Sequence, residues 1–166
     1  MSANLDDPRL TAMGLFAEAY VGLTGRLGSH LEQHRLSIVE FEVLMRLARS
    51  PGGRLRMTDL AAQTSLSTSG VTRVVDRMER DELVRRQACP SDRRSSYAVI
   101  TAAGLTRLDE TVPGQLELVE RWVFGQLEPA QLDTMLQALR TIRDAVHPCA
   151  TAGSDGRIDE VTAPQS

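Results

Sequence analysis

Residues 67–80 read STSGVTRVVDRMER, and this stretch combines the pattern of a packed helix with that of an exposed binding surface. Its apolar residues Val71, Val74, Val75 and Met78 follow the i, i+3, i+4, i+7 spacing of one helix face. Ser67 stands just before them, where its hydroxyl can accept a hydrogen bond from a free amide of the first turn. The pattern predicts an amphipathic helix that is N-capped by Ser67.

The segments on either side of this helix complete a known structural unit. Residues 57–64 predict a short helix, and residues 65–66 predict a turn that leads into the 67–80 helix. Residues 83–88 and 96–100 predict two strands, which a polar loop over 89–95 connects as a hairpin with an arginine-rich tip. Two short helices joined by a tight turn and followed by a hairpin predict a winged helix-turn-helix, in a fold that is mainly α (α+β).

Longer helices are expected outside this unit. Periodic apolar residues predict them over residues 10–33, 37–49, 101–126 and 129–147. Pro113 interrupts the third of these helices, and a proline inside a helix removes a hydrogen bond and usually produces a kink. Residues 54–56 are expected to form a short extended segment. Long helices therefore flank the winged unit on both sides.

Composition favours one helical domain in a reducing compartment. The chain has 166 residues, which suits a single core, and only 4% are aromatic, so the core must be mostly aliphatic. No segment approaches the roughly 18 apolar residues of a membrane helix, and residues 1–9 lack the apolar run of a signal peptide. We therefore expect a cytoplasmic protein without membrane contact, in which Cys89 and Cys149 are free thiols.

Charge is distributed unevenly along the chain. The net charge is −3, yet residues 54–94 hold nine arginines against six acidic residues, a local excess of three positive charges. Every cation is arginine, which suits bidentate contacts to phosphate and guanine, although codon bias would explain the missing lysine equally well. A local basic patch is enough for binding nucleic acid.

The polar side chains of the 67–80 helix and of the hairpin tip match what DNA recognition requires. Arg73 and Arg77 lie one turn apart, so both can face one wall of a groove, where arginine commonly reads guanine. Small hydroxyls at the start of the helix allow close approach to bases, and arginines on a thin loop can enter the minor groove. The predicted DNA-binding residues are Ser67, Thr68, Ser69, Thr72, Arg73, Arg77, Asp92, Arg93 and Arg94.

These segments together resemble the multiple antibiotic resistance regulator (MarR) family of transcriptional regulators. The resemblance covers roughly residues 10–147, and its most specific part is the wing motif Asp-x-Arg-x6-Thr, formed here by Asp92, Arg94 and Thr101. It implies a homodimer interlocked by its terminal helices, with the 67–80 helix in the major groove and the wing (89–95) in the minor groove. It also implies a pseudo-palindromic operator and a repressor that a small ligand releases.

The resemblance also suggests a division of the chain. An effector would bind between the dimer helices and the winged unit, and Tyr20, His34, Phe41 and Arg46 are the residues we expect there. No cofactor is expected. The expected parts are a flexible N-terminus (1–9), an N-terminal dimerisation helix (10–36), the winged helix-turn-helix domain (37–100), C-terminal dimerisation helices (101–147) and a disordered tail (148–166).

Two positions depart from the family's pattern. The family often has glycine in the helix-turn-helix turn and again just after the recognition helix, where this chain has Ser65 and Glu82. A left-handed backbone at either position would cost a residue other than glycine about 1 kcal/mol.

Other interpretations of these residues stay open. The arginines could form an ordinary solvated surface, and the winged unit could bind a protein while binding DNA weakly and without sequence preference. His30 and His34 have an i, i+4 spacing that can place two imidazoles on one metal ion, and Cys89 could be a redox sensor. No catalytic triad, Cys-x-x-Cys pair or phosphate loop is present, so an enzyme is not expected.

Overall fold

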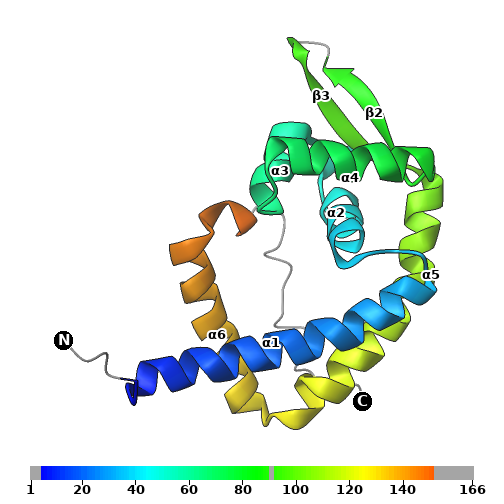
Figure 1. The fold of residues 1–166 in the computed structure, drawn as a ribbon. Helices are drawn as coiled ribbons and strands as arrows, with labels where there is room; N and C mark the ends of the chain where they lie inside the picture. The colour runs from blue at the N-terminus through cyan, green and yellow to red at the C-terminus, as the bar shows by residue number, and fades with distance from the viewer. Residues whose placement is uncertain (1–4, 90–91, 152–166) are drawn as a thin grey trace.

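A computed structural model describes residues 5–89 and 92–151 of the chain, apart from the side chains of residues 92–94 and 151 (Figure 1). The α-helices are α1 (Pro8–Gln33), α2 (Ile38–Ala48), α3 (Met57–Gln63), α4 (Thr68–Arg80), α5 (Ala102–Trp122) and α6 (Pro129–Val146). The strands are β1 (Arg54–Arg56), β2 (Val84–Cys89) and β3 (Asp92–Ile100). Short 3-10 helices are η1 (Pro51–Gly53), η2 (Phe124–Gln126) and η3 (Pro148–Thr151). The predicted winged helix-turn-helix fold is confirmed.

The head of the molecule, which we define as residues 36–100, contains α2, α3, α4 and the sheet. The sheet has the order β1-β3-β2, and both pairings are antiparallel. Under it, Leu44, Leu60, Val71 and Val75 are completely buried and form the centre of one aliphatic core. The apolar stripe predicted for α4 therefore faces this core, which leaves the opposite side of the helix exposed.

The frame, which we define as α1, α5 and α6, carries the head. Figure 1 shows α1 crossing beneath the head, with α5 rising to the head at one end and α6 rising toward α3 at the other. Pro113 lies inside α5, which continues past it as one helix and changes direction near its middle in Figure 1. Gly104 allows α5 to start against the sheet, because a Cβ there would stand 2.2 Å from the Leu83 carbonyl oxygen.

Local capping explains where α4 and α5 begin. Ser67 Oγ accepts a hydrogen bond from the Gly70 amide at 3.0 Å, as predicted. Thr101 caps α5 in the same way through the Gly104 amide, while its hydroxyl donates to the Glu82 carbonyl at 2.6 Å. The Thr101 side chain therefore links Glu82, which precedes β2, to the first turn of α5.

The backbone is left-handed at both positions where this chain departs from the family's glycine. Ser65 has a φ of 54° and Glu82 a φ of 59°, and Arg35 between α1 and α2 also has a φ of 56°. Such angles are unfavourable for residues with a Cβ. The chain therefore carries backbone strain on both sides of α4.

Several predicted boundaries were wrong. The loop predicted over 89–95 is much shorter, because β2 continues to Cys89 and β3 already begins at Asp92. Residues 54–56 are extended as predicted, and the structure adds their pairing with β3, which local sequence patterns do not show. At the chain ends, α1 begins at Pro8 with Asp7 as its cap, so residues 8 and 9, which were predicted to be flexible, are helical. The predicted disordered tail begins with η3, in which Ala150 is buried. Residues 1–4 and 152–166 lie outside the described part of the chain.

Candidate nucleic-acid interface

The N-terminal end of α4 presents small polar side chains to solvent. Ser67, Thr68 and Ser69 are exposed, and Thr72 one turn later is half-buried with its hydroxyl donating to the Thr68 carbonyl at 2.8 Å. The Ser67 and Ser69 hydroxyls are 3.1 Å apart. Because these side chains are short, this end of α4 can approach another surface closely, and its free amides favour an anion.

Arg73 is the exposed cation next to these hydroxyls. Its Nε donates to the Ser69 carbonyl at 3.3 Å, which directs the side chain back along the helix toward the N-terminal end. It takes part in no ion pair among the described residues, so its charge is not neutralised by a neighbouring carboxylate there. Arg73 and the small hydroxyls are therefore brought together on one exposed surface, as the sequence predicts.

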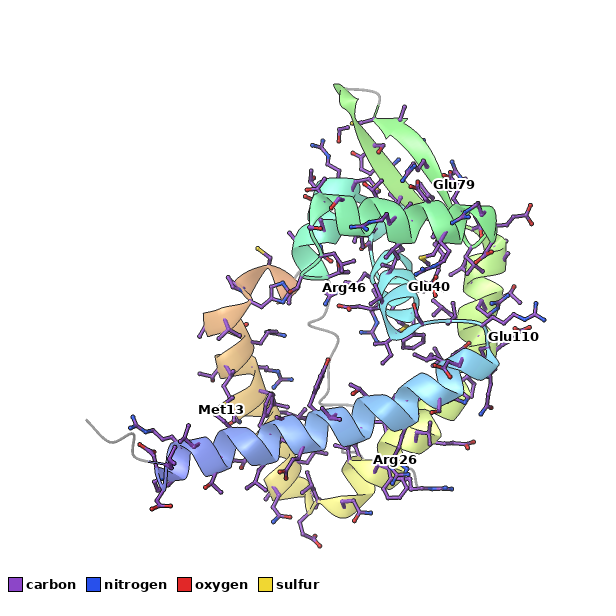
Figure 2. All side chains as sticks on the ribbon, in the orientation of Figure 1. Met13, Arg26, Glu40, Arg46, Glu79 and Glu110 are labelled. Atoms are coloured by element: carbon purple, nitrogen blue, oxygen red, sulfur yellow. The ribbon has the colours of Figure 1, made fainter. Side chains whose placement is uncertain are left out.

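Arg77, one turn after Arg73, forms an ion pair with a carboxylate of α2, and its contact with DNA stays a prediction. Its Nε lies 2.5 Å from Oε1 of Glu40, which Figure 2 places on α2 beneath α4. Glu40 is buried and also accepts hydrogen bonds from the amide and hydroxyl of Ser37, at 2.8 and 2.7 Å. Arg77 is about half exposed, so one edge of its guanidinium binds α2 while it keeps access to solvent. The ion pair between Arg77 and Glu40 holds α4 against α2, whereas Arg73 forms no ion pair among the described residues.

The Glu40 carboxylate is held in its charged form. Burial alone would raise the pKa of Glu40, but the hydrogen bonds from Ser37 and the hydrogen bond and charge of Arg77 outweigh it and lower the pKa below its ordinary value. The Ser37 and Glu40 pair is also a capping box that starts α2. One carboxylate therefore both caps α2 and anchors α4.

Arg86 on β2 ties the wing to α4, a role that is not predicted from the sequence. Its guanidinium lies 2.6 Å from the Asp76 carboxylate and donates to the Thr72 carbonyl at 3.3 Å. Its backbone amide donates to Glu79, labelled in Figure 2, at 2.8 Å. Strand alternation gives a signal for this role, because Arg86 shares the inward-facing side of β2 with buried Val84. The identity of its partners requires the fold.

The hairpin places the predicted wing residues at its far end. Val84 of β2 pairs with Ile100 of β3, and the ladder continues to Cys89 opposite Asp92 with an irregularity near the tip. The side chains of Asp92, Arg93 and Arg94 lie outside the described part of the chain. Their contact with DNA stays a prediction.

The four predicted effector residues do not share one contact network. Tyr20 is well exposed on α1, whereas His34, Phe41 and Arg46 are half-buried. Arg46, labelled in Figure 2, donates to the Ala150 carbonyl at 2.9 Å and pairs with Glu42. Phe41 packs against the head's core. The effector assignment therefore stays a prediction.

The predicted histidine pair is close but already engaged. The rings of His30 and His34 are 4.8 Å apart, and the Nε2 of His30 donates to the Thr111 carbonyl at 3.1 Å. Within the described residues, no cluster of three or more His, Cys, Asp or Glu side chains could hold a metal ion. Cys89 is buried, with its sulfur 3.9 Å from the Tyr97 hydroxyl.

A capped helix with an outward polar face, fixed to a β-hairpin by an internal ion pair, defines a winged helix DNA-binding protein. The MarR family profile matches residues 36–96, which is nearly the whole head. None of the described helices has the length and apolar content needed to cross a membrane.

Known structures extend this match to the frame. Sco3205, a MarR family transcriptional regulator from Streptomyces coelicolor solved in complex with DNA, is 31% identical with a TM-score of 0.82, covering 89% of this chain and 93% of that one. AbsC, a MarR family transcriptional regulator from the same organism, is 34% identical with a TM-score of 0.82, covering 87% and 98%. The transcriptional regulator MhqR of Bacillus subtilis (strain 168) is 28% identical over 109 residues, 66% of this chain and 74% of its own length. The chain belongs to the MarR family of transcriptional regulators.

Proposed function

We propose that this protein is a dimeric, sequence-specific DNA-binding regulator that places α4 in the major groove and the β2–β3 wing in the minor groove. The observation that carries the proposal is the exposed surface of Ser67, Thr68, Ser69 and Arg73 at one end of α4. Hydroxyls and a guanidinium on a helix are groups that read base edges. The Sco3205 structure, which contains DNA, supports the same use of the fold.

The proposed dimer rests on apolar surface that the frame leaves uncovered. Twelve large apolar side chains on α1, α5 and α6 are between 38% and 76% exposed, which is unusual for a frame with no partner. The exposed ones on these helices are Leu10, Met13, Leu15, Phe16, Tyr20, Val21, Leu105, Leu116, Trp122, Leu139, Ile142 and Val146. A second copy that covers this surface would present two α4 helices to half-sites one helical turn apart, about 10 bp.

The decisive experiment compares matched arginine variants on a duplex that the full-length protein selects from a random pool. Arg73→Ala should lower the affinity measured by fluorescence anisotropy at least about tenfold, since the guanidinium that binds guanine or phosphate is removed. Arg140→Ala, an exposed arginine of α6, serves as the control and should bind like the parent. Parent-like binding by Arg73→Ala would contradict the proposal.

The wing makes a separate test. Arg94→Ala should also weaken binding, and the loss should be smaller when the flank read by the wing is rich in G·C pairs, because a wider minor groove attracts arginine less. Equal losses on both flanks would argue against minor-groove insertion.

We propose further that the protein represses transcription and that a small effector releases it. A dimer covering an operator blocks other proteins from that segment of DNA. The effector would bind between the helices of the frame and the head, where Tyr20, His34, Phe41 and Arg46 are the proposed contacts, and would shift the spacing of the two heads. Transcription in vitro from a template with the selected operator tests the first statement, and retained effector response in Arg46→Ala would remove Arg46 from the site.

A protein-interaction module is the other candidate for this fold. It would bind DNA weakly and would not distinguish the selected duplex from a scrambled one. Competition with scrambled duplex therefore separates the two candidates in one titration.

A further inference from the structure

One face of the three-stranded sheet points away from the core of the head. Side chains alternate across a strand, and the register places Arg56 opposite Tyr97 and Arg54 opposite Val99. On the other side of β3, Arg85 also lies opposite Val99. The inner face is identified by Ala98, which is fully buried in the core. We define the outer sheet face as Arg54, Arg56, Arg85, Gln87, Tyr97 and Val99.

Tyr97 organises two of these arginines. The guanidinium carbon of Arg54 lies 4.9 Å from the centroid of the Tyr97 ring, and that of Arg56 lies 5.8 Å from it. The Nε of Arg56 donates to the Tyr97 hydroxyl at 3.4 Å. Guanidinium groups that stack on an aromatic ring lose less conformational entropy when they bind a further group.

The charge on this face is not neutralised by the described residues of the chain. Arg77 and Arg86 elsewhere in the head are paired with Glu40 and Asp76. In contrast, Arg54, Arg56 and Arg85 are exposed and form no ion pair among the described residues, and none of the carboxylates described shares their face. Asp59 on α3 adds only a weak attraction to Arg56. The face is therefore suited to a polyanion.

The position of the outer sheet face in the head indicates that the polyanion is DNA. Arg56 is the residue directly before α3, the first helix of the helix-turn-helix, which in this fold crosses the DNA backbone. Tyr97 is five residues from Asp92 along β3, about 17 Å from the wing tip at roughly 3.3 Å per residue. A duplex whose minor groove held the wing tip would continue past this face.

We propose that the outer sheet face is a second phosphate-binding surface, which grips the DNA backbone beyond the operator bases contacted by α4 and the wing tip. The proposal rests on the proposed function above. It adds sequence-independent affinity and a longer footprint, because Arg54, Arg56 and Arg85 contact phosphates and no bases.

The test uses the full-length protein and two duplexes, one ending at the operator and one extended by about one helical turn on each side. Arg54→Ala/Arg56→Ala should bind the extended duplex about tenfold more weakly than the parent and bind the short duplex equally well. The dependence of log affinity on log salt should become less steep by about 0.9 for each phosphate that the protein no longer neutralises. The preference for the operator over a scrambled sequence should not change.

Controls separate this proposal from folding and from the proposed function. Arg85→Ala, a single exposed change, should give a smaller loss of the same kind if the double variant proves unstable in a thermal melt. Arg140→Ala should match the parent on both duplexes. The proposed function fails if Arg73→Ala binds the operator like the parent and the parent binds operator and scrambled duplexes equally well. The proposal for the outer sheet face is tested separately, by the dependence of affinity on duplex length and on salt.

Three results would overturn the proposal. The double variant could bind the extended duplex with the parent's affinity and salt dependence. It could lose affinity equally on both duplexes, which would place the arginines inside the operator. It could keep full DNA affinity but lose binding to poly-L-glutamate, which would assign the outer sheet face to an acidic protein.

Discussion

The head and the frame differ in where their apolar side chains lie. In the head, Val43, Leu44, Leu47 and Leu60 have no exposed surface. In the frame, Tyr20, Leu116 and Val146 are each more than 60% exposed, although they occur at helical spacings typical of a packed face. The head therefore completes its own core within one chain, whereas the frame has large apolar side chains that the described residues leave uncovered.

The two regions are nevertheless connected at the end of α6. The His147 ring donates from Nε2 to the Ala62 carbonyl at 2.8 Å, and its Nδ1 lies 3.1 Å from the Ser65 hydroxyl in the helix-turn-helix turn. Arg46 of α2 holds the Ala150 carbonyl of η3. These contacts join the end of the frame to the turn that precedes α4.

The largest expected effect comes from opening the head's core. Leu44→Ala should lower the free energy of unfolding by about 2–5 kcal/mol, because removing its methyl groups leaves a cavity in a fully buried site. Leu116→Ala, at an exposed frame position, should change the stability of a monomer by less than about 0.5 kcal/mol. Urea unfolding at low protein concentration measures the free energy of unfolding of both variants. A similar loss of stability for the two would show that the frame is packed within one chain as tightly as the head.

A charge on the frame should act on assembly instead. Leu116→Glu should convert the dimer to a monomer and lower operator affinity about 100-fold, because two linked heads bind far more tightly than one. The far-UV spectrum should remain unchanged. Thr106→Glu, an exposed change at the head end of α5, is the matched control. A dimer that survives Leu116→Glu would place the partner surface elsewhere.

The Glu40 anchor within the head should contribute less and should depend on pH. Glu40→Gln should cost about 1–2 kcal/mol at pH 7, since the capping box and the Arg77 pair are both weakened. The folded state lowers the pKa of Glu40, so its contribution is complete above the ordinary glutamate pKa of about 4.3 and is lost as the pH falls through the lowered value. Unfolding curves from pH 7 to pH 3 should therefore converge for parent and variant. A constant difference would contradict the assigned role.

The smallest expected effect is a gain. Glu82→Gly should raise stability by about 0.5–1 kcal/mol, because glycine adopts the observed positive φ without strain. Ser65→Gly should gain less, since it removes the hydroxyl near His147. Thermal melts would measure both, and Thr106→Gly within α5 should show the opposite sign. A loss at Glu82→Gly would mean that its side chain matters more than its backbone angle.

Local sequence signals predicted most of the head. The spacing of Val71, Val75 and Met78 was enough to define the buried side of α4, and Ser67 was enough to define its start, because both depend on contacts a few residues apart. The exposed surface around Arg73 follows directly from that spacing. The family resemblance marked Ser65 and Glu82 as positions where glycine is common, and both have a positive φ in the structure.

Interactions between distant segments could not be predicted in this way. Arg73 and Arg77 look equivalent on the helix, and only the position of Glu40, 37 residues away, separates them. The pairing of β1 with β3, and the hydrogen bond from Arg46 to the Ala150 carbonyl, also join residues that are far apart along the chain. Each is set by tertiary contacts that leave no periodic pattern in the sequence.

The mass of the full-length protein in solution tests the contrast between head and frame most directly. Sedimentation equilibrium at micromolar concentration, without DNA, should give a species of about twice the 18.2 kDa of one chain. A single species of 18.2 kDa, at concentrations that saturate the selected operator, would contradict a frame built to be covered by a second copy.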